Sequence, residues 1–157
     1  MSKKTVAVGK KVPDFSAPST SGEKFRLKDA AGKKLVVYFY PKDNTPGCTK
    51  EGAAFRDLSR DFSKAGTMIV GVSPDSLASH QKFSEKMAFS FPLLSDEDRK
   101  LCELFDVIKE KSMYGRTFLG VERSTFLIDG AGVLRQEWRK VKVPGHAEEV
   151  LAAAKSL

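Results

Sequence analysis

The sequence predicts an α/β protein in which a mixed central β-sheet is flanked by helices. Two short runs that are almost wholly apolar, at 34–40 and 67–73, are typical of buried central strands, and a helical pattern lies between them. A strand, a helix and a second strand in that order favour parallel pairing. Turn residues at 129–132 separate two further strand-like runs and predict an antiparallel hairpin. The sheet should therefore contain strands of both directions.

The bulk composition is typical of one soluble globular domain. The 157 residues are 41% hydrophobic and 30% charged, which excludes a disordered or collagen-like chain. No apolar run reaches the ~18 residues that a membrane span requires, and the segment 1–15 lacks the apolar core of a secretory signal. We therefore expect a single domain over residues 1–157, in the cytoplasm.

The net charge of +7 raises the question of a nucleic-acid or membrane partner. The basic residues occur in small groups along the whole chain, with acidic residues between them, and no nucleic-acid-binding motif accompanies them. They are interpreted as a solvated surface, and neither kind of partner is expected.

The first strand, at 34–40, is followed by a turn-rich segment at 41–47. Within that segment Thr45 and Pro46 predict a helix start, because an N-cap residue is followed by proline at the first helical position. The helix should end near Gly66. Its apolar residues have helical spacing: Phe55, Leu58 and Phe62.

After the second strand, the residues from Ser73 predict another helix, with an inner face that carries Leu77, Gln81 and Phe83 or residues near them. A short apolar stretch at 91–94 and a short helix at 98–105 follow.

The end of the chain combines a loop, a hairpin and a helix. Residues 106–122 have mixed polarity and are predicted to form a long loop. Strands at 124–128 and 133–138 form the hairpin, and 146–155 has helical spacing. A strand–helix–strand unit followed by a hairpin and a last helix is the plan of the thioredoxin fold.

Two cysteines, Cys48 and Cys102, are too few for a disulfide framework and have no C-x-x-C or zinc-ligand spacing. Cys48 lies in the first turn of the helix that starts at Thr45. Unpaired N–H groups and the helix dipole stabilise a thiolate at such a position, so Cys48 is a candidate nucleophile. The alternative is a small core residue.

The segment YPKDNTPGCTKE, from Tyr40 to Glu51, resembles the active-site segment of the peroxiredoxins, in which Pro, three residues, Thr and two residues precede Cys. The stretches GVSPDS, FPLLSD, SMYG and ERSTFLID resemble the bacterioferritin-comigratory or Q branch of that family. The resemblance covers nearly the whole chain.

The resemblance implies a thiol-dependent peroxidase that reduces hydrogen peroxide and organic hydroperoxides through a Cys48 sulfenic acid. Thr45 would hold its hydroxyl against the peroxide and the thiolate, a role that is compatible with its place as the helix N-cap. Arg123 would stabilise the thiolate and polarise the O–O bond. Pro41 would shield the pocket from water, and the backbone N–H groups of Gly47 and Cys48 would donate to the peroxide.

The same resemblance implies antioxidant defence, no metal or organic cofactor, and a thioredoxin, glutaredoxin or small-thiol reductant. It also suggests a monomer. Glu51 would either pair with an active-site arginine or favour the helix N-terminus electrostatically.

The usual resolving cysteine is missing. In this branch it commonly lies five residues after the nucleophile, where this chain has Ala53, or in the following helix, where it has Ser84. Ser84 is hypothesised to replace a resolving cysteine, naturally or by deliberate substitution; the alternative is an ordinary helix serine. Cys102 is interpreted as a core residue and is a weaker candidate for resolution. Otherwise an external thiol must resolve the sulfenic acid.

Two other function classes fit the sequence less well. A dithiol oxidoreductase would need C-x-x-C, which is absent, and a binding module with a vestigial cysteine would leave the motif without a purpose. His80 and His146 lack partners at metal-ligand spacing and are expected in surface or capping roles.

Overall fold

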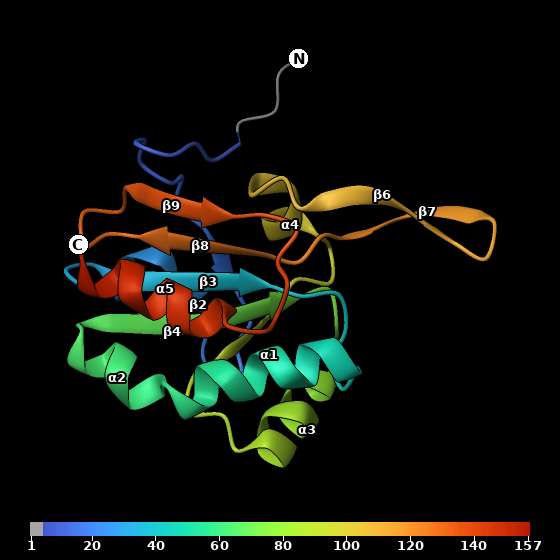
Figure 1. The fold of residues 1–157 in the computed structure, drawn as a ribbon, viewed down its shortest axis with the longest axis horizontal. Helices are drawn as coiled ribbons and strands as arrows, with labels where there is room; N and C mark the ends of the chain where they lie inside the picture. The colour runs from blue at the N-terminus through green and yellow to red at the C-terminus, as the bar shows by residue number, and fades with distance from the viewer. Residues whose placement is uncertain (1–4) are drawn as a thin grey trace.

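The computed structural model describes residues 5–157, and a five-stranded mixed sheet forms its centre (Figure 1). The middle strand is β3 (Lys34–Phe39). On one side β4 (Thr67–Ser73) and then β5 (Leu93–Ser95) run parallel to it. On the other side β8 (Ser124–Ile128) and β9 (Leu134–Trp138) complete the sheet in antiparallel pairs. The predicted mixed sheet and its thioredoxin-like plan are confirmed.

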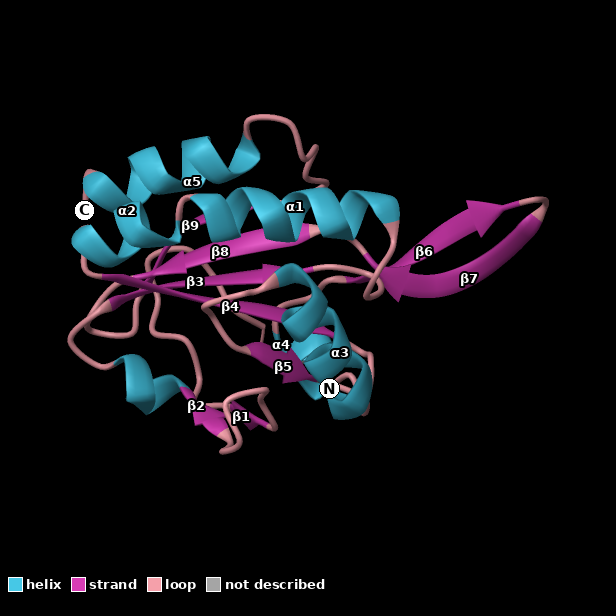
Figure 2. Cartoon of the chain, turned by 90° about the horizontal axis from the view of Figure 1, so that it is seen from below, coloured by secondary structure: helices cyan, strands magenta, loops and turns pink. Residues whose placement is uncertain are grey.

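One face of the sheet is covered by α1 (Pro46–Asp57), α2 (Ser59–Lys64) and α5 (His146–Lys155), as Figure 2 shows. The last helix has the predicted bounds. The single helix predicted from Thr45 is divided in two, because Leu58 has a ψ of 5° and leaves the helical conformation. The core tolerates the break, since the phenylalanines on either side of it are fully buried.

Helix α3 (Leu77–Met87) packs beside β5 and begins at Ser76, whose hydroxyl accepts a 3.1 Å hydrogen bond from the amide of Ser79. Its buried residues are His80 and Phe83. The prediction that Gln81 faces inward is wrong, because Gln81 is exposed. His80 and Phe83 define the buried face of the helix, and the residue directly after His80 points away from that face.

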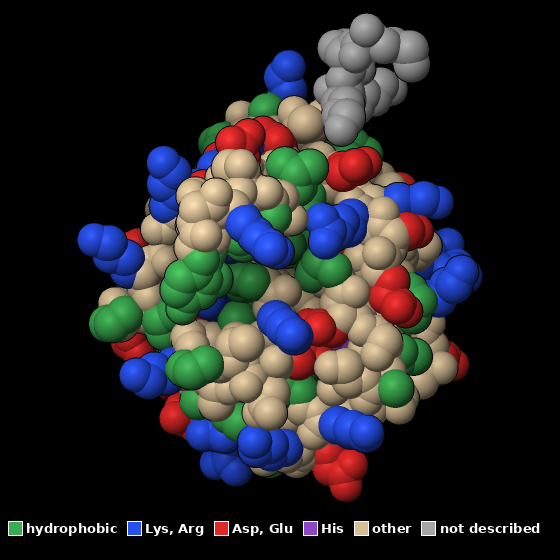
Figure 3. Space-filling view, turned by 90° about the vertical axis from the view of Figure 1, so that its right-hand side faces the viewer, with side chains coloured by type: hydrophobic (Ala, Val, Ile, Leu, Met, Phe, Trp, Pro, Cys, Tyr) green, Lys and Arg blue, Asp and Glu red, His purple; other side chains and the backbone are tan. Residues whose placement is uncertain are grey.

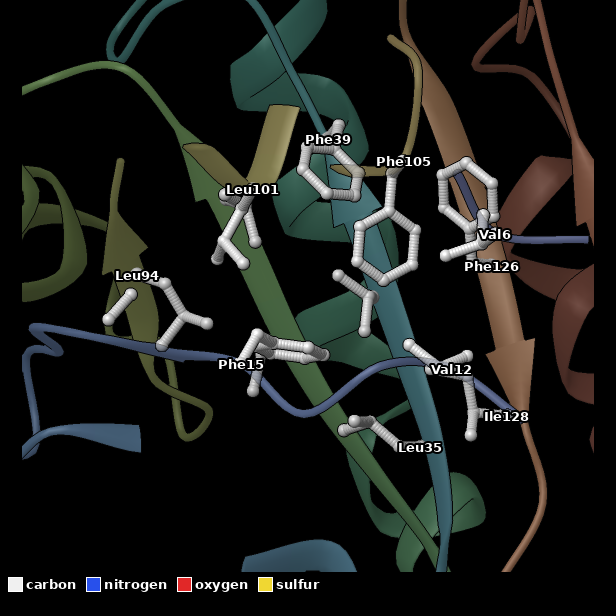
Figure 4. Packing of buried hydrophobic residues seen from close by; sticks show 14 of the residues in the cluster. Val6, Val12, Phe15, Leu35, Phe39, Leu94, Leu101, Phe105, Phe126 and Ile128 are labelled. Carbon is white, nitrogen blue, oxygen red and sulfur yellow. The ribbon is translucent and has the colours of Figure 1, made fainter. Parts of the chain in front are cut away.

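The other face of the sheet is covered by the N-terminal segment, which contains β1 (Ser16–Ala17), β2 (Phe25–Arg26) and the 3-10 helix η1 (Leu27–Ala30), and by α4 (Lys100–Leu104). Figure 4 shows the packing on this face, where aromatic and aliphatic side chains from these segments meet those of β3 and β8.

The middle strand explains why there are two hydrophobic clusters. Leu35, Val37 and Phe39 point into the cluster beneath the N-terminal segment, whereas Val36 and Tyr38 point into the cluster beneath α1 and α5. Successive side chains of a strand point to opposite faces. Because both faces are covered, the strand reads as a continuous apolar run.

The long loop predicted at 106–122 is instead a hairpin of β6 (Ile108–Met113) and β7 (Arg116–Val121), which extends away from the sheet in Figures 1 and 2. Its two-residue turn has Tyr114 at φ 54° and Gly115 at φ 77°, the positive values of a type I′ turn. The pattern did not reveal these strands because neither face is deeply buried over most of their length, so apolar and polar residues do not alternate.

Within residues 5–157 the helices are all too short or too polar to cross a membrane.

Candidate active site

Cys48 is the third residue of α1 and is only 2% exposed. The predicted helix start is confirmed, with Thr45 extended at the N-cap and Pro46 after it. The amide of Thr49 donates to the carbonyl of Thr45 at 2.9 Å. The N–H groups of Gly47 and Cys48 precede that bond and have no acceptor within the helix. They are available to an anion or a polar ligand beside the sulfur.

Arg123 reaches this helix from the residue before β8, which pairs with β3 in the sheet. Its Nη2 donates to Cys48 Sγ at 3.3 Å, and its Nη1 donates to Glu51 Oε1 at 2.6 Å. One guanidinium therefore contacts two side chains of the first turns of α1. The positive charge of Arg123 thus lies 3.3 Å from the sulfur.

Glu51 is 1% exposed, and burial raises its pKa to about 7 although Arg123 opposes the shift. Its second oxygen, Oε2, has no hydrogen-bond partner among residues 5–157. Burial would lower the pKa of Arg123, but Glu51 and Cys48 outweigh it and raise that pKa. Glu51 therefore pairs with Arg123, and the predicted alternative, a purely electrostatic effect on the helix, does not describe its contacts.

Gly47 provides the space that Arg123 occupies. A Cβ at this position would lie 3.1 Å from Arg123 Nη2, closer than side-chain carbons usually approach other atoms. The glycine thus permits the guanidinium to lie against the start of the helix.

Thr45 and Pro41 border the same segment. Thr45 occupies the predicted N-cap position, but its hydroxyl donates to the carbonyl of Lys42 at 2.8 Å and makes no side-chain cap of the helix. The hydroxyl binds there because the carbonyl of Lys42 offers an acceptor within the turn. No hydrogen bond joins this hydroxyl to Cys48 in the described residues. Pro41 is half-buried and lies two residues after the end of β3.

Cys102 belongs to a different part of the core. It is fully buried in the cluster beneath the N-terminal segment, whereas Cys48 lies in the cluster on the opposite face of the sheet. Its amide donates to Asp96 Oδ2 at 2.8 Å, and burial strongly raises the pKa of its thiol. The sheet separates the two cysteines.

Ser84 and Ala53 lie on the two helices that meet near the site. Both are half-buried, in α3 and α1 respectively. The contact between these regions is close, because a Cβ on Gly52 would lie 2.5 Å from the ring of Phe89, just beyond α3.

Sequence reasoning missed a buried polar cluster on the other side of the loop before Cys48. Asp43 is 7% exposed and accepts hydrogen bonds from Tyr40, Ser79 and His80. The surface roles predicted for the two histidines are wrong, since His80 is fully buried and His146 nearly so. The three-residue spacing of His80 and Phe83 on a helix was the one available signal.

His146 is buried between α1 and the sheet. Its Nε2 lies 2.8 Å from Thr125 Oγ1, and burial lowers the pKa of its ring.

Figure 3 shows the charged side chains on the face toward which the hairpin extends. Lysines and arginines are spread over this face, with acidic side chains among them. No single basic patch dominates the view.

The chain matches the AhpC/TSA family over residues 8–137. Peroxiredoxin Bcp of Xanthomonas campestris is 55% identical over 143 residues, covering 91% of this chain and 89% of the relative. Peroxiredoxin Bcp of Bacillus subtilis is 49% identical over 153 residues, or 98% of each chain.

Solved structures of the same family are similar to this chain. Peroxiredoxin Q of X. campestris superposes with a TM-score of 0.86 at 55% identity, covering 90% of each chain. Two mutants of that protein, each with a different cysteine changed to serine, are 56% and 54% identical to this chain. The bacterioferritin comigratory protein of X. campestris is described as having alkyl peroxide reduction activity.

Proposed function

The chain belongs to the AhpC/TSA family, in its peroxiredoxin Bcp or Q branch, and on that premise we propose that Cys48 is the peroxidatic nucleophile of this thiol peroxidase. The observation that carries the proposal is the bridge of Arg123 from Cys48 Sγ to Glu51. It supports a sulfur held as a thiolate beside a fixed positive charge.

The reaction begins with attack of the Cys48 thiolate on the terminal oxygen of ROOH. The S–O bond forms as the O–O bond breaks, the leaving RO⁻ takes a proton from solvent, and the products are Cys48 sulfenic acid and ROH. Negative charge moves from sulfur to the leaving oxygen. The Arg123 guanidinium and the N–H groups of Gly47 and Cys48 are placed to stabilise that charge.

Thr45 and Pro41 have supporting roles in the proposal. The Thr45 hydroxyl donates a hydrogen bond to the carbonyl oxygen of Lys42, which leaves its own oxygen able to accept a hydrogen bond from the peroxide. Pro41 limits the access of water from the loop side.

Reduction of the Cys48 sulfenic acid requires thiols from other molecules. One thiol condenses with the sulfenic acid to give a mixed disulfide and water, and a second thiol releases Cys48 and forms the external disulfide. Cys102 is unsuited to the first step, because it lies across the sheet and its buried thiol ionises with difficulty. The reductant is then a thioredoxin, a glutaredoxin or a small thiol.

Ser84 occupies the position of a resolving cysteine. The identity to X. campestris peroxiredoxin Q is 55%, rises to 56% with one cysteine-to-serine mutant and falls to 54% with the other. A rise is expected if the introduced serine aligns with a serine of this chain, and a fall if the lost cysteine aligns with Cys48. The position of Ser84 on a helix beside α1 suits that role.

The test is to treat the reduced protein with one equivalent of hydrogen peroxide and a sulfenic-acid trap, and to map the modified peptides by mass spectrometry. Cys48 should carry the trap, Cys102→Ser should react as the unchanged protein does, and Cys48→Ser should not react. An unmodified Cys48 with full recovery of both thiols would refute the proposal.

A second experiment tests the resolving position. In Ser84→Cys, one equivalent of peroxide should produce an intramolecular disulfide that involves Cys48 and consume the sulfenic acid. Gln81→Cys is the matched control, because Gln81 is exposed on the same helix. Equal disulfide yields from the two variants would show that position 84 has no special geometry.

A further inference from the structure

A buried polar cluster connects α3 to the loop that leads to Cys48. Asp43 lies in that loop and accepts hydrogen bonds from three side chains: Tyr40 Oη at 2.6 Å, Ser79 Oγ at 2.8 Å and His80 Nδ1 at 2.7 Å. His80 is fully buried. Among the described residues no hydrogen bond joins these groups to Cys48, and the reaction described above does not use them.

His80 has a hydrogen-bond partner at each ring nitrogen. Its Nε2 lies 2.8 Å from the carbonyl oxygen of Leu94 and its Nδ1 lies 2.7 Å from Asp43 Oδ2. A carbonyl oxygen can only accept, so Nε2 carries a hydrogen and donates it to Leu94. Burial would raise the pKa of Asp43, but hydrogen bonds from His80 and Tyr40 outweigh it and lower that pKa. His80 therefore joins the loop residue Asp43 to β5.

The same loop is held at neighbouring positions. The amide of Asp43 donates to Asp75 Oδ2 at 2.8 Å, and that oxygen also accepts from Ser73 Oγ at 2.6 Å. Lys86 of α3 donates to Asn44 Oδ1 at 2.9 Å. Asn44 has a φ of 62°, a left-handed conformation that asparagine adopts more readily than most residues.

Asp43, Asp75 and His80 also have the composition of a metal site, and their ligand atoms lie within 4.8 Å of one another. Both nitrogens of His80 are already occupied by hydrogen-bond acceptors. The carboxylates accept from protein donors. The cluster is complete without an ion.

We propose that His80 is a positioning residue for the peroxidase reaction: paired with Asp43 and bound to Leu94, it fixes the loop before Cys48 to α3 and β5. The loop determines where Thr45 and the first turn of α1 lie. That turn must place Cys48 Sγ at 3.3 Å from Arg123. Since an error of about 1 Å in the placement of a reacting group can slow a reaction about 100-fold, a loosened loop should lower the rate of Cys48 oxidation. The inference rests on the proposed role of Cys48.

The kinetic test compares two neutral replacements by stopped-flow measurement of Cys48 oxidation at limiting peroxide. The side-chain amide of His80→Asn takes the place of Nδ1 and can still donate to Asp43. The longer side chain of His80→Gln places its amide near the position of Nε2, where it can donate to Leu94 but leaves Asp43 without the hydrogen bond from residue 80. We expect His80→Gln to react about 10- to 100-fold more slowly than the unchanged protein, and His80→Asn to recover part of the loss. Gln81→Ala is the control on the exposed face of the same helix.

Asp43→Asn provides the partner for a double-mutant cycle. If the two residues act as one unit, the double variant with His80→Gln should be no slower than the slower single variant. Additive losses, or an unchanged rate in His80→Gln, would overturn the proposal. If the unchanged protein itself failed to oxidise at Cys48, the proposed function would fail instead.

Nitrogen NMR of the unchanged protein gives a readout that does not depend on folding of the variants. The chain has two histidines. His80 should show a hydrogen on Nε2 that exchanges slowly with solvent, because it is bound to the buried carbonyl of Leu94. A His80 ring without a hydrogen on Nε2 would remove the contact with β5 on which the proposal depends.

Discussion

At the scale of single residues, Arg123 determines the environment of the reactive sulfur because its two terminal nitrogens serve two partners. Lysine offers one ammonium group and cannot span Cys48 Sγ and Glu51 Oε1 at once. We expect Arg123→Lys to slow the oxidation of Cys48 by hydrogen peroxide by about 10²-fold, the loss typical of one preorganised donor. Stopped-flow rates at several peroxide concentrations measure it. Arg135→Lys, at an exposed ion pair, is the control, and an equal loss there would contradict the prediction.

Glu51 makes stability depend on pH. Its pKa is raised from 4.5 to about 7 in the folded protein, so between these values the folded state keeps a proton that the unfolded state loses. The contribution of Glu51 to the free energy of unfolding is therefore full below pH 4.5 and is lost as pH rises to about 7. Glu51→Gln has no such contribution.

Urea unfolding of both proteins across this pH range tests the sign. The free energy of unfolding of the unchanged protein, minus that of Glu51→Gln, should decrease as pH rises. A constant difference, or one that increases, would show that burial does not dominate the titration of Glu51.

At the scale of elements, substitutions in the β6–β7 hairpin and in the central strands should change the free energy of unfolding by different amounts. Phe118 and Leu119 are 44% and 62% exposed, whereas Phe126 on β8 is fully buried. Changing both hairpin residues to threonine should alter the free energy of unfolding by less than about 1 kcal/mol. Phe126→Ala should cost about 3–5 kcal/mol. Chemical denaturation measures the free energy of unfolding of both variants. A large decrease in the hairpin variant would mean that the hairpin contributes to the core.

At the scale of the whole molecule, the two hydrophobic clusters share one sheet. Strands β3 and β8 supply residues to both clusters, so neither cluster can be lost without removing the support of the other. We expect one cooperative unfolding transition. Fluorescence of Trp138, which packs against the cluster beneath α1 and α5, should give the same midpoint as far-UV circular dichroism. Separate midpoints would show that the two faces unfold independently.

Most of the fold could be predicted from local patterns. The strand at 67–73 and the helix at 146–155 have their predicted bounds, because continuous burial and helical spacing leave direct traces in a sequence. The hairpin at 108–121 could not be predicted in this way, since strands that extend away from the core need no alternating pattern. The contacts of Thr45 and His80 depended on neighbouring carbonyl and carboxylate oxygens.

The sequence by itself determined the order of the central strands, the mixed sheet and the position of Cys48 at the start of a helix. Each of these follows from patterns among residues that lie close together in the sequence. Only the tertiary structure decided that Arg123, 75 residues from Cys48, donates to its sulfur, and that Cys102 lies across the sheet. The physical reason is that pairing of β3 with β8 and packing on the two faces of the sheet set these distances.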